Sequence, residues 1–336
     1  KPKRVIKKDV LIISNNSRFV WANSIEALKK IKFNYKKIIY QTNSKKLKFS
    51  ILTRILIKFK FFIDEFKIHD KIKRELKRKK YDEIIFIQPF YVSACQIKKL
   101  KKLYPYLKFS AIFIDPIFKS NYFTFNILFS LKLFDKIIYR QPFFEIFFKI
   151  IRHNNAIRCF PGSNFAINKI KNNKYVNDVT FIGSYEKERA NDINFLANNG
   201  IVINIYGNGW ENKLKGSKNI KLNEPIYGKE FFKKIYSSKI NLAFLRKKNN
   251  DVYNSKTVEI LSAGGFMMSE YSSYIEKFFK KNVHVIYFLN KEDLLKKIIF
   301  YLQNNKKREM IKKSAFDKYK KLLTNYSDQL TVLLKN

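Results

Sequence analysis

The sequence predicts an α/β protein made of two consecutive Rossmann-like domains. Short apolar, β-branched runs alternate with longer amphipathic ones along most of the chain. The alternation breaks once, near residues 156–177, and then restarts. The length of 336 residues also exceeds what most single hydrophobic cores support, and it suits two domains of ordinary size.

The first half carries strand-like runs that are continuously apolar. Such runs are typical of parallel strands buried on both faces, and helical patterns at 23–32 and 93–103 lie between them. A parallel sheet covered by helices is therefore expected. Its predicted strands are Asp9–Ser14, Lys36–Gln41, Asp82–Pro89, Phe109–Asp115 and Asp135–Arg140.

The break in the pattern is polar, with "CFPGSN" followed by "NKIKNNKYVND", and contains Pro161 and Gly162. It predicts a first domain at 1–160, a linker at 161–177 and a second domain at 178–310. Residues 311–336 are expected to form a C-terminal helix that could pack back toward the first domain.

The second half repeats the strand–helix alternation. Asn290 followed by Asp293 is typical of a helix N-cap with an acid in the first turn. The predicted strands are Asp178–Ser184, Ile201–Gly207, Ile240–Leu245, Phe266–Glu270 and Val283–Leu289. The predicted helices include Glu186–Asn198, Lys229–Ser237 and Asn254–Ala263.

The formal charge of +42, from 69 basic and 27 acidic residues, is extreme. It has two explanations: a lysine-rich codon bias spread over a solvated surface, or a basic surface for anionic lipid, polysaccharide or nucleic acid. The basic residues run from end to end without a recognisable nucleic-acid-binding module, so no specific nucleic-acid partner is expected.

The two cysteines, Cys95 and Cys159, form no CxxC or Cys/His cluster, and the histidines are scattered. No metal site is therefore expected, and the cysteine usage suits a reduced, cytoplasmic setting. No uninterrupted apolar run reaches the roughly 18 residues that a membrane span needs.

All nine glycines lie after residue 161. Glycine is used where backbone turns tightly or approaches a ligand closely, so a bound nucleotide is expected in the second domain. In "FIGSYEKER" a strand ends at Gly183 and Ser184 can cap the next helix, where Lys187 or Arg189 could reach a diphosphate. A plain strand-to-helix turn is the alternative.

Two further stretches are candidates for the same site. "IYGNGW" ends a strand at Tyr206 and Gly207, although a lone GxG is weak evidence. In "SKTVEILSAGG" a cap at Asn254 or Ser255 places Lys256 and Thr257 in a first turn that favours anions.

The same stretch holds Glu259 about one turn into the helix. Its carboxylate could accept hydrogen bonds from the vicinal hydroxyls of a ribose, or it could merely complement the helix dipole. Gly264-Gly265 are expected to end this helix.

Taken together, the second half resembles the CgeB/YkvP-type, group-1-like glycosyltransferases of GT-B fold, in which two Rossmann-like domains face each other across a cleft. The segments that carry the resemblance are "DVTFIGSYEKERANDINFLANNGIVINIYGNGW", "YSSKINLAFL", "SKTVEILSAGGFMMSEYSSYIEKFF" and "NKEDLLKKIIFYLQNNKKREMI". Their order and spacing agree with the family, whereas the first half agrees only in its alternating layout.

The resemblance implies a nucleoside-diphosphate-sugar donor bound as co-substrate by the second domain, with no bound cofactor or metal. Glu259 corresponds to the glutamate that holds the donor ribose, and Asp251 stands where the family has an earlier glutamate. Lys256 falls where many relatives have arginine and would face the diphosphate. Arg189 resembles the basic residue after the Gly-Ser turn.

The resulting hypothesis is glycosyl transfer to an acceptor hydroxyl, on a glycan or a lipid-linked molecule, in cell-surface glycan or glycoconjugate synthesis. Lys256 and Arg189 would stabilise the leaving diphosphate. An inverting enzyme would need a base in the first domain, for which Asp115 is the candidate, although it could equally be a turn acid before Pro116.

The cationic and apolar stretch at residues 45–66 could lie on anionic lipid at the inner face of the membrane, or it could be a core-facing helix with lysines in water. A basic nucleic-acid-binding protein and an inactive protein of GT-B fold are the remaining functional alternatives.

Overall fold

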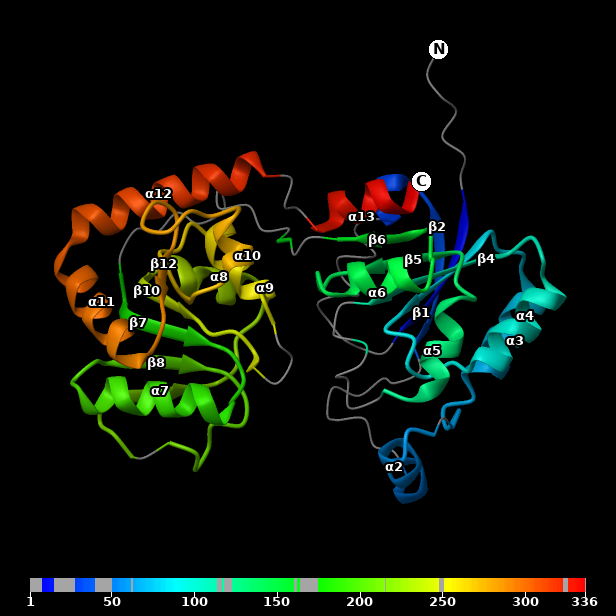
Figure 1. The fold of residues 1–336 in the computed structure, drawn as a ribbon, viewed down its shortest axis with the longest axis horizontal. Helices are drawn as coiled ribbons and strands as arrows, with labels where there is room; N and C mark the ends of the chain where they lie inside the picture. The colour runs from blue at the N-terminus through cyan, green and yellow to red at the C-terminus, as the bar shows by residue number, and fades with distance from the viewer. Residues whose placement is uncertain are drawn as a thin grey trace, which may run out of the picture. The chain divides into compact units, whose positions relative to one another are not determined.

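The computed structural model divides into two compact units. Unit 1 contains residues 1–160 and 326–336, and unit 2 contains residues 161–325. The structure describes residues 8–14, 28–39, 50–61, 63–113, 117, 123–159, 162–163, 175–214, 216–247, 251–322 and 326–335. Both units are layered α/β structures (Figure 1).

Among its described residues, unit 1 has one parallel sheet with the strand order β2-β1-β3-β4-β5-β6. Leu11 and Ile13 of β1 enter one hydrophobic core, whereas Val10 and Ile12 enter the core on the other face. Burial on both faces explains the continuously apolar strands. The strands are β1 (Asp9–Ser14), β2 (Asn34–Ile39), β3 (Glu83–Ile87), β4 (Lys108–Phe113), β5 (Lys136–Tyr139) and β6 (Ala156–Arg158).

The labelled helices of unit 1 are α2 (Ile51–Lys58), α3 (Ile68–Arg78), α4 (Ala94–Leu103), α5 (Phe125–Leu131), α6 (Phe144–Ile150) and α13 (Tyr326–Lys335). The start of α4 is fixed by a capping box between Ser93 and Gln96. The C-terminal helix α13 lies beside β6 (Figure 1) and contributes Leu330 to the core.

Burial raises the pKa of the Cys159 thiol to about 12, so this thiol stays protonated.

Unit 2 has a second parallel sheet with the strand order β12-β11-β10-β7-β8-β9. The chain moves outward from β7 to β8 and β9, and then crosses to β10 on the other side of β7. This is the doubly wound Rossmann order, and β7 and β10 flank its switch point. The strands are β7 (Asn177–Ile182), β8 (Ile203–Tyr206), β9 (Ile220–Asn223), β10 (Ser238–Ala243), β11 (Met267–Glu270) and β12 (Ile286–Phe288).

The helices of unit 2 are α7 (Lys187–Asn198), α8 (Gly228–Tyr236), α9 (Ser255–Ser262), α10 (Ser273–Glu276), α11 (Lys291–Gln303) and α12 (Asn305–Lys321). The predicted cap of α11 is confirmed, because Asp293 N donates to Asn290 Oδ1 at 2.9 Å. The residues after 310 belong to both units, since α12 is part of unit 2 and α13 is part of unit 1.

The predicted fold class is confirmed: the chain contains two Rossmann-like domains. Each predicted strand overlaps a strand of the structure. The short edge strands β6 and β9 were not predicted, because neither is a buried apolar run. Most of the predicted linker lies outside the described residues.

The Gly264-Gly265 pair ends α9, as predicted. Gly264 has φ +64° and donates to Leu261 O, and Gly265 donates to Ile260 O. These two bonds form a Schellman motif, whose left-handed position favours glycine. A Cβ on Gly265 would lie 2.5 Å from Ile235 Cγ2, so this glycine also permits close packing on α8.

Candidate functional site

The candidate site lies at the carboxyl end of β7 and β10, the switch point of the unit 2 sheet. In open α/β sheets, ligands bind where the connections on either side of such a point diverge. The loop after β7 carries Gly183 and Ser184, and the loop after β10 leads to the start of α9. Most of the residues predicted for the donor site therefore meet at this edge.

Arg189 joins the two loops from inside unit 2. Its guanidinium donates to Ser184 O at 3.2 Å and to Phe244 O at 3.4 Å, and it lies 3.5 Å from the Glu186 carboxylate. The residue is only 6% exposed, and burial lowers its pKa. The sequence suggested a contact with a diphosphate; in the structure, two of the guanidinium nitrogens are engaged by backbone carbonyls.

The N-cap of α9 is Asn254, which settles the choice between Asn254 and Ser255. Asn254 Oδ1 accepts from Thr257 N at 3.3 Å, and Asn254 Nδ2 donates to Phe244 O at 2.9 Å. Arg189 and Asn254 thus donate to the same carbonyl oxygen. This shared acceptor fixes the start of α9 against the helix that follows β7, with Ser255, Lys256 and Thr257 in its first turn.

Lys256 and Glu259 form an ion pair one turn apart, with Nζ 3.0 Å from Oε2. The ammonium group also lies 3.9 Å from the centre of the Phe231 ring of α8. Glu259 is 5% exposed and lies beyond the first turn of α9. A buried carboxylate that is ion-paired with a partly exposed lysine can still accept a hydrogen bond from a neutral or a charged donor.

Thr257 is buried, at 2% exposed, and its Oγ1 makes no hydrogen bond with the described residues. Buried hydroxyl groups normally have a partner, because an unmade bond costs free energy. The backbone N–H of Thr257 is already capped by Asn254. The hydroxyl group near the start of α9 therefore has hydrogen-bonding capacity that the described residues do not use.

The loops after β7 and β8 touch through their glycines. A Cβ on Gly207 would lie 2.0 Å from Gly183 O, the same oxygen that accepts a hydrogen bond from Trp210 Nε1 at 2.8 Å. Gly207 is thus required for contact between the two loops. The sequence could reveal Gly207, but not that the atom closest to it is a backbone oxygen rather than a ligand atom.

Tyr206 and Asp251 differ in their surroundings. Tyr206 is buried, and its hydroxyl lies 3.5 Å from the Asn177 amide at the amino end of β7, so its side chain points into unit 2. Asp251 is half-buried; its backbone N–H donates to Arg246 O, and its negative charge acts on Arg189. Asp115 lies outside the described residues.

A network of charges that the sequence did not identify surrounds Arg189. Arg246 Nε lies 3.4 Å from Glu186, and Glu270 Oε2 accepts from Leu245 N at 2.5 Å. Burial raises the pKa of Glu270 and that of Asp192. Glu270 is the last residue of β11. Its position at the end of a strand beside the switch point is the sequence feature that could have marked it as a candidate site residue.

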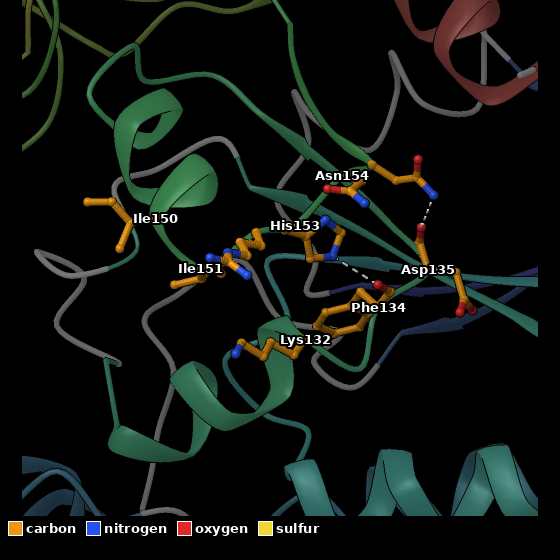
Figure 2. A pocket seen from close by; sticks show the side chains of 9 residues that line it. Lys132, Phe134, Asp135, Ile150, Ile151, His153 and Asn154 are labelled. Carbon is orange, nitrogen blue, oxygen red and sulfur yellow. Dashed lines mark hydrogen bonds between the residues drawn. The ribbon is translucent and has the colours of Figure 1, made fainter.

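Figure 2 shows a separate hollow of about 600 Å³ in unit 1. His153 Nε2 lies 3.0 Å from Phe134 O, and Asn155 Nδ2 donates to Asp135 O at 3.1 Å. The hollow lies at the amino ends of β5 and β6, opposite the edge where open sheets bind ligands. It contains none of the predicted site residues.

Among the described residues, no three His, Cys, Asp or Glu side chains are grouped as they would be around a metal ion. No helix among the described residues combines the length and apolar character needed to cross a bilayer.

Residues 189–330 match the protein-family model described as "Glycosyl transferase-like". The match starts at Arg189 and covers the candidate site from α7 onward, but less than half of the chain. A comparison with curated proteins gave no match.

Solved structures of similar fold cover nearly the whole chain. They include a glycosyltransferase of Rickettsia africae (12% identity, TM-score 0.62, 98% of this chain and 97% of that chain). A sucrose-phosphate synthase of Thermosynechococcus elongatus has 8% identity and a TM-score of 0.67, with 98% and 97% coverage. HepE of Anabaena, in complex with UDP-glucose, has 9% identity and a TM-score of 0.62, with 97% and 98% coverage. The chain thus has the GT-B fold class, and its unit 2 is similar to glycosyl transferase-like domains.

Proposed function

We propose that this protein is a glycosyltransferase that moves a sugar from a nucleoside-diphosphate-sugar donor to an acceptor hydroxyl. The observation that carries the proposal is the construction of the unit 2 switch point. There the first turn of α9 is fixed beside the loop after β7 and carries a lysine and a buried hydroxyl without a described partner, and the buried carboxylate of Glu259 follows in the next turn. The glycosyl transferase-like match and the UDP-glucose complex of HepE support it.

Each residue of this cluster has a proposed role. The first-turn amides of α9 and Lys256 bind the diphosphate and stabilise it as it leaves. Glu259 accepts hydrogen bonds from the ribose hydroxyls. Thr257 donates to a phosphate oxygen, while Gly183, Ser184 and Gly207 line the site with backbone. Arg189 acts by holding the loops together.

Unit 1 binds a glycan or a lipid-linked acceptor, with Asp115 as the base if the reaction inverts the anomeric configuration of the sugar.

Asp251 contacts hydroxyls of the donor sugar. The nucleoside-diphosphate sugar is the co-substrate, and no further cofactor takes part. The proposed activity is CgeB/YkvP-type hexosyl or related glycosyl transfer in cell-surface glycan or glycoconjugate synthesis, at the cytoplasmic face of the membrane.

The test is a panel of nucleoside diphosphates and their sugars added to the full chain. The matching nucleotide should raise the melting temperature, because a ligand at about 100 times its Kd stabilises the folded state by about 2.7 kcal/mol. Release of that diphosphate from its sugar should follow when acceptor is added. No shift with any nucleotide, together with salt-sensitive binding to arbitrary DNA, would favour the nucleic-acid-binding alternative instead.

A further inference from the structure

The helix α2 exposes the side chains that a core-facing helix would bury. Ile51, Leu52, Phe59 and Phe61, in and just after the helix, are between 61% and 76% exposed. The one buried residue of α2 is the polar Thr53. The structure therefore does not show the core-facing helix that was the alternative for this stretch, and no residue that the structure describes covers the apolar face of α2.

The start of α5 continues this apolar surface. Phe125 N donates to Lys60 O at 3.2 Å, and Lys60 Nζ lies 5.7 Å from the centre of the Phe123 ring. On α5, the side chains of Phe125 and Phe129 are 55% and 72% exposed. Exposed apolar surface that is continuous over two elements is unusual in a monomer and marks an interaction site.

The charges on this surface have one sign. Arg54 and Lys58 are exposed beside the apolar side chains, and residues 51–61 contain no acid. The nearest acids are used inside unit 1: Asp64 accepts hydrogen bonds from backbone at the start of α3, and Glu65 accepts one from Ser50 N. A cationic rim around bulky apolar side chains complements an anionic bilayer, where the apolar groups enter the headgroup region.

We propose that the α2–α5 surface, comprising residues 51–61 and the exposed face of α5, docks unit 1 on a bilayer of anionic lipid. Both helices follow the carboxyl ends of strands, α2 after β2 and α5 after β4, and this edge of a sheet is where ligands bind. The inference extends the proposed function by giving a lipid-linked acceptor a route to unit 1. Vesicle binding without donor tests the surface independently of transfer.

The first experiment measures flotation of the full chain with vesicles of neutral phosphatidylcholine and with vesicles that also contain phosphatidylglycerol. Wild-type protein should float with the anionic vesicles only. Phe59→Glu should lower vesicle affinity at least about tenfold, since it removes a bulky apolar side chain from the headgroup region. Leu103→Glu is the matched control, because Leu103 is 59% exposed at the end of α4, near the amino end of β4.

A second pair of variants separates local charge from net charge. Arg54→Gln/Lys58→Gln should weaken binding to anionic vesicles about 30-fold, from about 1 kcal/mol per basic residue near the surface. Lys98→Gln/Lys102→Gln removes the same charge from exposed positions of α4 with the same spacing, and it should change binding little.

Three results would overturn the proposal: no flotation of wild-type protein, equal losses in each variant and its control, or equal binding to neutral vesicles. Light scattering after size exclusion tests whether a second copy of the chain, rather than a bilayer, covers this surface. A wild-type dimer that Phe59→Glu converts to a monomer, without vesicle binding, would assign the α2–α5 surface to a second copy of the chain. The exposed positions of these substitutions keep folding intact, which circular dichroism checks.

Discussion

Lys256 and Glu259, the two side chains proposed to bind the diphosphate and the ribose of the donor, are ion-paired with each other at 3.0 Å. The pair is compatible with both assignments only if each group retains hydrogen-bonding capacity for the donor. Nζ has three protons and each carboxylate oxygen has more than one lone pair, so this condition is met. The pair also positions the carboxylate near the start of α9.

Glu259→Gln should weaken binding of the diphosphate identified in the panel by about 10- to 100-fold. The physical reason is the loss of charged hydrogen bonds to the ribose, each of which contributes roughly 1.5–3 kcal/mol. Isothermal titration calorimetry gives the Kd. Glu188→Gln, on the exposed surface of α7, is the control and should bind like wild type. An unchanged Kd in Glu259→Gln would remove the ribose assignment.

Thr257→Val should separate binding from stability. The hydroxyl group has no described partner, so the nearly isosteric valine should leave the free energy of unfolding equal or higher, while diphosphate affinity falls. Thr180→Val is the opposite case, because the Thr180 and Ser238 hydroxyls lie 2.7 Å apart in the core. It should lose about 1 kcal/mol of stability and keep its affinity. Loss of stability in Thr257→Val would show that the hydroxyl has a structural partner.

Arg189→Gln should lower the free energy of unfolding by about 2 kcal/mol, because the substitution removes the buried charged group that donates to two backbone carbonyls. Arg189→Lys should not restore it, since a single ammonium group lacks the fork that spans both loops. Urea unfolding gives the comparison, with exposed Lys187→Gln as control. A large loss of diphosphate affinity at unchanged stability would instead indicate direct contact with the donor.

Gly207→Ala should destabilise unit 2 severely, because the new methyl group would lie 2.0 Å from Gly183 O. Gly200→Ala is the matched control: its φ of +84° carries a cost of about 1–2 kcal/mol, but no atom lies within 4 Å of the new Cβ. Thermal unfolding followed by circular dichroism ranks the two variants. Equal melting temperatures would mean that the loops after β7 and β8 separate at little cost.

Glu270 should make stability depend on pH. Burial raises its pKa above the ordinary value of 4.5, so the folded state holds this proton more tightly than the unfolded state. The stabilising contribution is therefore complete below pH 4.5 and is lost as the pH rises through the folded-state pKa. Glu270→Gln should flatten this part of the curve of unfolding free energy against pH, whereas Glu188→Gln should not. An unchanged curve would contradict the assignment.

Much of the fold could be predicted because its signals are local. A continuously apolar run such as that of β1 identifies a strand buried on both faces, and Asn290 with Asp293 marks a helix start within four residues. Edge strands such as β9 lack such a signal, because most of their side chains stay in contact with water. For the candidate site, Gly183, Lys256 and Glu259 stay predictions from the sequence, which gave no sign of the partners of Arg189.

The sequence by itself determined two Rossmann-like domains and the position of α9, because hydrophobic period, caps and left-handed glycines act over a few residues. Only the tertiary structure decided that Arg189 and Asn254 share the carbonyl of Phe244, because three segments meet there through the crossover from β9 to β10. It likewise decided that α2 exposes its apolar face. Amphipathic spacing defines a face, but only packing determines whether that face meets a core or water.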